Sequence, residues 1–358
     1  MIDTITVSPS LTPYASLDEL LKNEDTNYVF SARNTHHSQS GQDKSRAWGQ
    51  DTSKSVRFGF DEDKKINRVE GNLPKLLDAA RGNLKPSNGI QIKTQAEFDA
   101  GVSALLFELI KLCGNVSCSD LPISRIDLVL NLHLNPREVL PLMRHARHPM
   151  VRRETETYRN DGSSWKSNLV NPFENLNTVR FSGTKTVITL YDKVRQLLSK
   201  QGKTWPDETI CVRVEVQLKG KAHIAKAFGQ PEANYITLDE VNFENCYHVF
   251  RSILCQFDHV GKLPLFKPNL VNLLATHELY PECWGIYGGM SPLEWYRTTS
   301  KVTDKTFKEM RRQVRRAVME LKQFNWHEIL HPTQLPDLVD IDHKGRETFI
   351  PSPWGWGR

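Results

Sequence analysis

The sequence predicts an α+β fold, in which a mostly antiparallel sheet flanked by helices precedes a helical C-terminal domain. Two observations support this prediction. Segments with alternating apolar residues recur up to about residue 230, and stretches with helical spacing separate them. After about residue 231 the strand patterns stop and only helical spacing remains. We therefore expect a first domain at 1–230 and a helical second domain at 231–358.

The first third of the chain combines polar, alternating and helical patterns. Residues 31–55 are polar and aperiodic, which predicts a long loop. Two alternating segments, 56–60 and 66–70, predict a β-hairpin. Thr94 and Glu97 form a capping box, and apolar residues at helical spacing follow them. A helix is therefore expected directly after Thr94.

Alternating patterns predict most of the remaining sheet. Further strands are expected at 123–134, 178–181, 186–191 and 209–219. Asn135 and Pro136 indicate a helix after the first of these strands, and a second helix is expected from about Lys221. This order of strands and helices fits an α+β domain.

The C-terminal region is expected to contain three helices and an irregular tail at 351–358. Two helices are predicted at 238–257 and 291–300, and Thr306 with Glu309 predicts the start of a third. The apolar residues of the third helix are three and four positions apart: Phe307, Met310, Val314, Ala317, Leu321 and Phe324. Such spacing predicts one buried stripe.

A local excess of positive charge coincides with the third helix. The segment 301–323 holds eight basic and three acidic residues, so its net charge of +5 equals that of the whole chain. A helix, a short turn and a basic helix over 291–324 resemble a helix-turn-helix. Such a patch is typical of a polyanion-binding surface, and an ordinary solvated face is the alternative.

Composition and missing motifs exclude several classes of protein. With 39% hydrophobic and 25% charged residues, the 358-residue chain is not mainly disordered, collagenous or a coiled coil. Apolar runs too short for a membrane helix, and a start without a secretory signal, lead us to expect a cytoplasmic protein. The six cysteines form no C-x-x-C pair and are expected to be thiols. No Walker, G-x-S-x-G or H-E-x-x-H motif occurs.

The polar faces of two predicted strands hold the candidate site residues. They are Arg125, Asp127, Val129, Asn131 and His133 on the first strand, and Arg213, Glu215, Gln217 and Lys219 on the last. Ion pairs on a surface face would explain the alternating charges. Alternatively, Asp127 and Glu215 bind a divalent cation, because Mg²⁺ needs only one or two carboxylates. His133 completes half of the His-hydrophobic-His motif of many nicking enzymes and is a further candidate ligand.

Tyr191 is the candidate nucleophile. It ends an apolar strand, and Lys193 follows two residues later. Such a tyrosine is often only a core residue with a solvated hydroxyl. However, a nearby cation and a metal favour the phenolate of a side chain whose ordinary pKa is about 10.

Several short segments, taken in order, resemble the gene II replication initiation proteins of filamentous phages. The length and the opening Met1-Ile2-Asp3 are similar to the replication proteins of vibrio filamentous phages. The segments are Val69–Lys75 with Gly82-Asn83, Ile123–Asp127, Thr186–Lys193, Val212–Lys219 and the helix pair at 291–324. Three of them, around Asp127, Tyr191 and Glu215, are also similar to segments of plasmid rolling-circle initiators. The resemblance implies a nicking domain followed by a separate C-terminal region.

The resemblance also implies a rolling-circle initiator, a metal-dependent endonuclease and ligase in the bacterial host cytoplasm. Tyr191 would attack one strand of the origin and keep the 5′ phosphate, assisted by Lys193, and a second transfer would rejoin the displaced strand. Asp127, Glu215 and His133 would hold Mg²⁺ or Mn²⁺, and Glu70 lies near a family acidic position. The family's second histidine is missing at 131, where this chain has asparagine.

The implied partners are double-stranded and single-stranded origin DNA, a host helicase, a DNA polymerase and further copies at the origin. Basic residues of both regions are expected to contact DNA: Arg125, Arg213, Lys219, Lys308, Arg311, Arg312, Arg315 and Arg316. Two other functions fit the sequence, a non-catalytic origin-binding regulator and a metal-dependent phosphodiesterase without a covalent intermediate. Tyr158 is the next candidate nucleophile.

Overall fold

The structure is a computed structural model of the 358-residue chain. It describes residues 1–8, 28–34, 45–51, 55–60, 66–82, 91–143, 146, 148–150, 156–158, 178–199, 211–257, 270–279, 284–285, 287–300, 302–322, 326–336, 338–341 and 347–349. The predicted α+β class with a mostly antiparallel sheet is confirmed.

The chain forms two compact units, and neither is a continuous segment. Unit 1 comprises residues 1–130, 216–250 and 340–343, and unit 2 comprises 131–215, 251–339 and 344–358. The predicted domains at 1–230 and 231–358 stay a prediction. Two strands, β6 (Ile123–Leu132) and β10 (Val212–Lys219), have residues in both units.

Unit 1 is built on a sheet with the strand order β2-β3-β4-β5-β1-β6-β10. Its other strands are β1 (Ile2–Val7), β2 (Tyr28–Asn34), β3 (Ser45–Asp51), β4 (Val56–Phe60) and β5 (Ile66–Asn72). β1 pairs antiparallel with both β5 and β6, although it is the first strand of the chain. β6, which carries Arg125 and Asp127, therefore lies inside the sheet.

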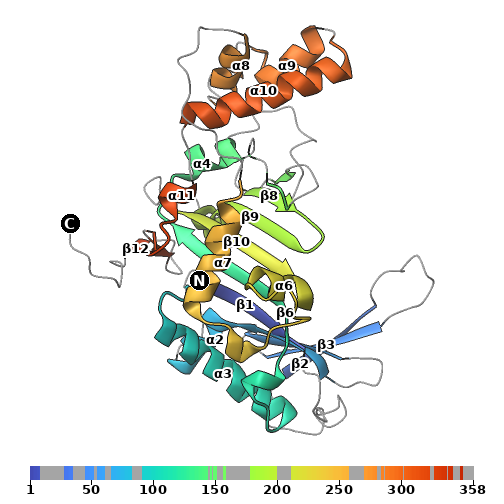
Figure 1. The fold of residues 1–358 in the computed structure, drawn as a ribbon, viewed down its shortest axis with the longest axis vertical. Helices are drawn as coiled ribbons and strands as arrows, with labels where there is room; N and C mark the ends of the chain where they lie inside the picture. Colours follow the sequence, from blue (N-terminus) through green and yellow to red (C-terminus); the bar gives the residue numbers. More distant parts are fainter. Residues whose placement is uncertain are drawn as a thin grey trace. The chain divides into compact units, whose positions relative to one another are not determined.

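The two faces of this sheet differ in chemistry. Thr6 is opposite both Glu70 and Arg125, so these side chains share the polar face. The other face is apolar and packs on helices α2 (Leu73–Ala80) and α3 (Gln95–Cys113), drawn in teal in Figure 1. α3 is capped by Thr94 as predicted, since Thr94 Oγ1 accepts a hydrogen bond from the Glu97 N–H at 3.1 Å. Packing on the apolar face leaves the polar face for other contacts.

Short helical segments complete unit 1. They are the 3₁₀ turns η1 (Cys118–Asp120) and η3 (Leu238–Glu240), α6 (Lys221–Ala227) and the first part of α7 (Phe243–Leu254). α6 begins at Lys221, as predicted.

Unit 2 contains the strand order β10-β9-β8-β7. Its strands are β7 (Glu156–Tyr158), β8 (Thr178–Ser182), β9 (Thr186–Asp192) and the first half of β10. Helix α4 (Pro136–Met143) follows the end of β6 as predicted, and α5 (Lys193–Ser199) follows β9 directly. Tyr191 therefore lies near the end of β9, and Lys193 is the first residue of α5.

Three helices of unit 2 pack together, as Figure 1 shows in orange. α8 (Leu270–Leu279) contacts both α9 (Pro292–Thr299) and α10 (Asp304–Lys322). The short helix α11 (Trp326–Ile329) and a two-stranded sheet of β11 (Val339–Ile341) and β12 (Glu347–Phe349) follow.

Several sequence predictions need correction. The predicted loop at 31–55 contains β3 and most of β2. Backbone pairing of β2 with β3, and of β3 with β4, stabilises strands that lack an apolar alternation. The third C-terminal helix begins at Asp304 rather than Thr306, because Thr303 Oγ1 caps it by accepting from the Thr306 N–H at 3.3 Å. Strands also recur after residue 231, in β11 and β12. The predicted turn at 61–65 and the tail at 351–358 lie outside the described residues.

No helix in the described part of the chain is long and apolar enough to cross a membrane.

Candidate active site and nucleic-acid interface

A tyrosine and a glutamate meet on neighbouring strands of unit 2. Tyr191 lies near the end of β9 and Glu215 on β10, and the Tyr191 hydroxyl donates a hydrogen bond to Glu215 Oε1 at 2.6 Å. The Tyr191 ring is buried, whereas the Glu215 side chain is 33% exposed. The pair thus combines a fixed phenol with a carboxylate that reaches solvent.

Lys193 supplies a cation beside the tyrosine. Its Nζ lies 5.7 Å from the centre of the Tyr191 ring and donates to Gln196 Oε1 at 2.9 Å. Asp192, between the two residues, accepts a hydrogen bond from the Arg195 N–H in the first turn of α5. The turn from β9 into α5 therefore keeps the buried lysine close to the ring, as the sequence predicted.

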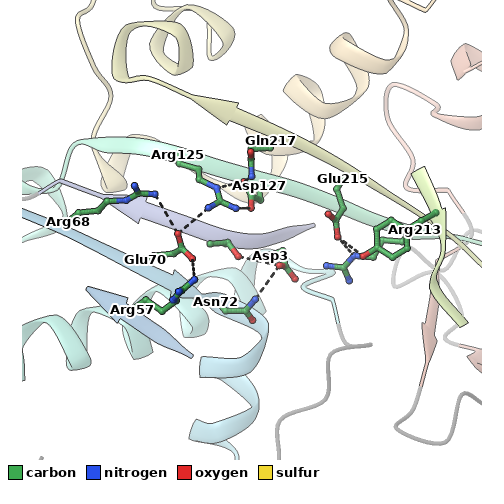
Figure 2. A network of polar contacts seen from close by, with 12 residues as sticks. Asp3, Arg57, Arg68, Glu70, Asn72, Arg125, Asp127, Arg213, Glu215 and Gln217 are labelled. Atoms are coloured by element: carbon green, nitrogen blue, oxygen red, sulfur yellow. Dashed lines mark hydrogen bonds and ion pairs between the residues drawn. The ribbon is translucent and has the colours of Figure 1, made fainter. Parts of the chain in front are cut away.

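Arg213 approaches the same glutamate oxygen from within β10. Its Nε donates to Glu215 Oε1 at 2.8 Å, and its side chain is only 3% exposed. Figure 2 shows the two side chains turned towards each other. Glu215 Oε1 thus accepts hydrogen bonds from both Tyr191 and Arg213.

The polar face of unit 1 carries a separate network centred on Glu70. Three arginines from three strands surround this carboxylate in Figure 2. Arg125 Nη1 lies 3.1 Å from Oε2, Arg68 Nη2 3.5 Å from Oε2, and Arg57 Nη1 3.9 Å from Oε1. The predicted acidic position at Glu70 is therefore fully engaged by guanidinium groups.

Asp127 belongs to the same network. Arg125 donates to both of its oxygens, and Gln217 Nε2 donates to Oδ1 at 3.0 Å. Burial raises the pKa of the Asp127 carboxyl, and the hydrogen bonds from Arg125 and Gln217 offset only part of that rise. Arg125 therefore links two carboxylates, Glu70 and Asp127, on neighbouring parts of the sheet.

The predicted metal ligands do not form one described constellation. Asp127 belongs to unit 1, whereas Glu215 and His133 belong to unit 2. His133 is exposed just after the end of β6. Among the residues that the structure describes, no group of three or more His, Cys, Asp and Glu side chains could hold a metal. The predicted ligand set stays a prediction, because its members belong to different units.

Helix α10 presents the predicted basic surface. Its buried residues are Val314, Ala317 and Val318. The exposed basic residues are Lys305, Lys308, Arg312 and Arg316, while Arg311 and Arg315 are half-buried. We call the four exposed residues the α10 basic stripe. Within the stripe, Arg312 pairs with Glu309 at 2.7 Å.

The turn from α9 into α10 is held by side chains on both helices. Arg297 of α9 stacks over the Phe307 ring of α10, with its Cζ 5.1 Å from the ring centre, and its Nη2 lies 3.7 Å from Asp304. Glu278 of α8 is 1% exposed and accepts a hydrogen bond from the Leu293 N–H at the start of α9. These contacts make the three helices one packed group that carries the α10 basic stripe.

The structure sorts the other predicted DNA contacts into two kinds. Lys219 is exposed at the end of β10. Arg125 and Arg213 instead hold carboxylates, and Arg213 is buried. Tyr158, the alternative nucleophile, lies on β7, but its side chain is outside the described residues.

Sequence reasoning found most members of the two clusters, but it missed Arg57, Arg68 and the contacts within each cluster. It assigned Glu215 to a metal, whereas the structure places its carboxylate on the Tyr191 hydroxyl. The hydrogen bond requires β9 beside β10, and no local pattern specifies that order. Comparison of the sequence with protein-family models and with curated proteins found no match.

Proposed function

We propose that this protein is a rolling-circle replication initiator that nicks and rejoins one DNA strand through a covalent bond to Tyr191. The observation that supports it best is the 2.6 Å hydrogen bond from the Tyr191 hydroxyl to Glu215. A nucleophile within hydrogen-bond reach of a carboxylate, with a third group orienting that carboxylate, is the arrangement that covalent catalysis requires. Arg213 is the third group.

The reaction proceeds by exchange of one ester for another. The Tyr191 oxygen attacks the phosphorus and Glu215 accepts the phenol proton, while the bond from phosphorus to the 3′ oxygen breaks. The 3′ oxygen leaves as a hydroxyl after taking a proton from solvent, and the 5′ phosphate stays on the tyrosine. Attack by a 3′ hydroxyl reverses these steps. One phosphodiester replaces another, so rejoining needs no nucleotide cofactor.

A requirement for Mg²⁺ or Mn²⁺ remains part of the proposal. When bound, such an ion polarises phosphate oxygens and stabilises the added charge of the transition state. Asp127, Glu215 and His133 stay its proposed ligands from the sequence. Lys193, beside the Tyr191 ring, supplies a positive charge from the protein itself.

The proposed partner is the phage origin, in double-stranded and single-stranded form. The α10 basic stripe follows a short turn from α9, an arrangement that supports a helix docked against duplex DNA. A host helicase and a DNA polymerase complete the proposed pathway, because the sequence contains no Walker motif. The proposed location is the host cytoplasm, because the phage origin is present there.

The decisive experiment compares Tyr191→Phe with Tyr235→Phe. Each protein is incubated with labelled single-stranded origin DNA and Mg²⁺, then run on a denaturing gel. The wild type and Tyr235→Phe, which changes an exposed tyrosine of unit 1, should retain labelled DNA. Tyr191→Phe keeps the ring and its packing but loses the attacking oxygen, so its adduct should fall to background.

The alternatives give different results. An adduct that persists in Tyr191→Phe would place the nucleophile elsewhere, and Tyr158→Phe would then be examined. Nicking without any adduct in the wild type indicates a phosphodiesterase that uses water. Origin binding without nicking indicates a non-catalytic regulator, which the packed helices α8, α9 and α10 would suffice to form.

A further inference from the structure

We propose that Arg213 is a positioning residue that holds the Glu215 carboxylate against the Tyr191 hydroxyl. This inference rests on the proposed function and assigns Arg213 a role other than the DNA contact expected from the sequence. Three observations in unit 2 support it: the shared oxygen, the burial of Arg213 and the geometry of its donor group.

The shared oxygen couples the three side chains. Tyr191 Oη and Arg213 Nε both donate to Glu215 Oε1, at 2.6 and 2.8 Å. Arg213 and Glu215 are two residues apart on β10, so their side chains leave the same side of the strand. The guanidinium therefore fixes the rotation of the carboxylate from a rigid element, and Tyr191 meets an oxygen that is already in place.

Burial separates this role from phosphate binding. The Arg213 side chain is 3% exposed, whereas the Glu215 side chain is 33% exposed. A phosphate contact needs a guanidinium that solvent and DNA can reach. Of the two, it is the carboxylate that can face the DNA, with the arginine behind it.

The chemistry of the donor explains why arginine occupies this position. A guanidinium is planar and its Nε–H has a fixed direction relative to the other donors, whereas a lysine ammonium rotates freely. Arg213→Lys therefore keeps the positive charge but loses the directed Nε–H. Displacement of a reacting group by about 1 Å can cost on the order of 100-fold in rate.

The first test measures adduct formation in a single turnover, with DNA affinity measured separately. We expect Arg213→Lys to lower the rate constant by roughly 10- to 100-fold, with unchanged DNA affinity and unchanged salt dependence. Arg81→Lys is the matched control, since Arg81 pairs with Glu97 in unit 1 and is exposed. A weaker affinity with a flatter salt dependence would mean that Arg213 contacts phosphate, and would overturn the inference.

The second test is a double-mutant cycle with Glu215→Gln. If Arg213 acts through Glu215, Arg213→Lys should lower the rate little further once Glu215 is replaced. Independent losses that multiply would contradict a positioning role.

The third test needs no DNA and separates this inference from the proposed function. The Cζ resonance of Tyr191 in protein labelled with ¹³C at tyrosine Cζ, assigned by its loss in Tyr191→Phe, reports the hydrogen bond to Glu215. Arg213→Lys and Glu215→Gln should move it in the same direction, and Arg81→Lys should not move it. An unchanged resonance in folded Arg213→Lys would overturn the inference, even where Tyr191→Phe abolishes the adduct. A moved resonance with an adduct that survives Tyr191→Phe would reject the proposed nucleophile and keep the positioning contact.

Discussion

Arg125 holds Asp127 with two parallel hydrogen bonds, from Nε to Oδ1 at 2.9 Å and from Nη2 to Oδ2 at 2.5 Å. The two residues are neighbours on one face of β6, so the bidentate contact forms within a single strand. Such a pair is costly to bury, because both charges lose water. The outcome for Asp127 is a raised pKa, which makes the stability of unit 1 sensitive to pH.

The Asp127 carboxyl should make folding less favourable as the pH rises. Burial raises its pKa above the ordinary value of about 3.9, so the folded state binds this proton more tightly than the unfolded state does. The resulting stabilisation is complete below pH of about 3.9 and is lost as the pH rises through the folded-state pKa. We therefore expect the free energy of unfolding of the wild type, minus that of Asp127→Asn, to decrease between pH 4 and 8.

Urea unfolding of both proteins across this range measures the difference. Asp239→Asn, which replaces an exposed aspartate of η3, is the control for removing a carboxylate. A difference that grows with pH would mean that the ion pair with Arg125 outweighs burial and that the pKa of Asp127 is lowered instead.

Replacing Glu215 should distinguish a proton acceptor from a metal ligand. Glu215→Gln removes the carboxylate that accepts the hydrogen bond from the Tyr191 hydroxyl. We expect adduct formation to slow by roughly 10²- to 10⁴-fold, the usual contribution of a general base. A phenol ionises without a base at high pH, so the loss should be smaller at pH 9 than at pH 7. Single-turnover rates at both pH values test this expectation.

The metal dependence of the same variant provides the contrast. Recovery of Glu215→Gln by higher Mg²⁺ or Mn²⁺, with no recovery at higher pH, would support the metal-ligand role expected from the sequence. Origin binding should be unchanged in either case, because the α10 basic stripe is intact.

Local patterns predicted most of the elements because burial and periodicity agree there. Ile126, Leu128 and Leu130 alternate in sequence and are fully buried in β6. β1 was missed because its buried residues Ile2 and Ile5 are three positions apart, which breaks the alternation. The strands β2 and β3 were missed for a different reason, since pairing with a neighbouring strand decides their conformation and leaves no mark on their own sequence.

The candidate site was predictable in its members and not in its contacts. Tyr191, Lys193 and Glu215 follow from chemistry read along the chain. Their hydrogen bonds depend on strand order, which joins residues 24 positions apart for Tyr191 and Glu215. The burial of Arg213 also depends on tertiary packing. From the sequence alone, a basic residue in an alternating strand is expected to face solvent.

Gly71 is a position where an added side chain would have to displace a leucine of the neighbouring helix. A Cβ added to Gly71 on β5 would lie 2.6 Å from Leu105 Cδ1 of α3, and Leu105 is fully buried. Gly71→Ala should therefore lower the free energy of unfolding by about 1–3 kcal/mol. Gly285→Ala, where nothing lies within 4 Å, is the control and should change little. If Leu105→Ala does not relieve part of the loss in Gly71→Ala, the clash is not its cause.

The α10 basic stripe should supply DNA affinity rather than chemistry. Neutralising Lys308, Arg312 and Arg316 to glutamine removes exposed charges from one helix and leaves its buried side intact. Because phosphate contacts release counterions, each lost contact should reduce the slope of log affinity against log salt by about 0.9. The matched control removes three exposed charges from unit 1, in Arg81→Gln, Lys111→Gln and Lys226→Gln, and should leave the slope unchanged.

Duplex affinity measured from 50 to 300 mM salt gives the slope for each protein. Equal slopes in the two triple variants would identify the stripe as ordinary solvated surface. Adduct formation on short single-stranded origin DNA at saturating concentration should stay near the wild-type rate, because Tyr191, Glu215 and Arg213 are unaltered.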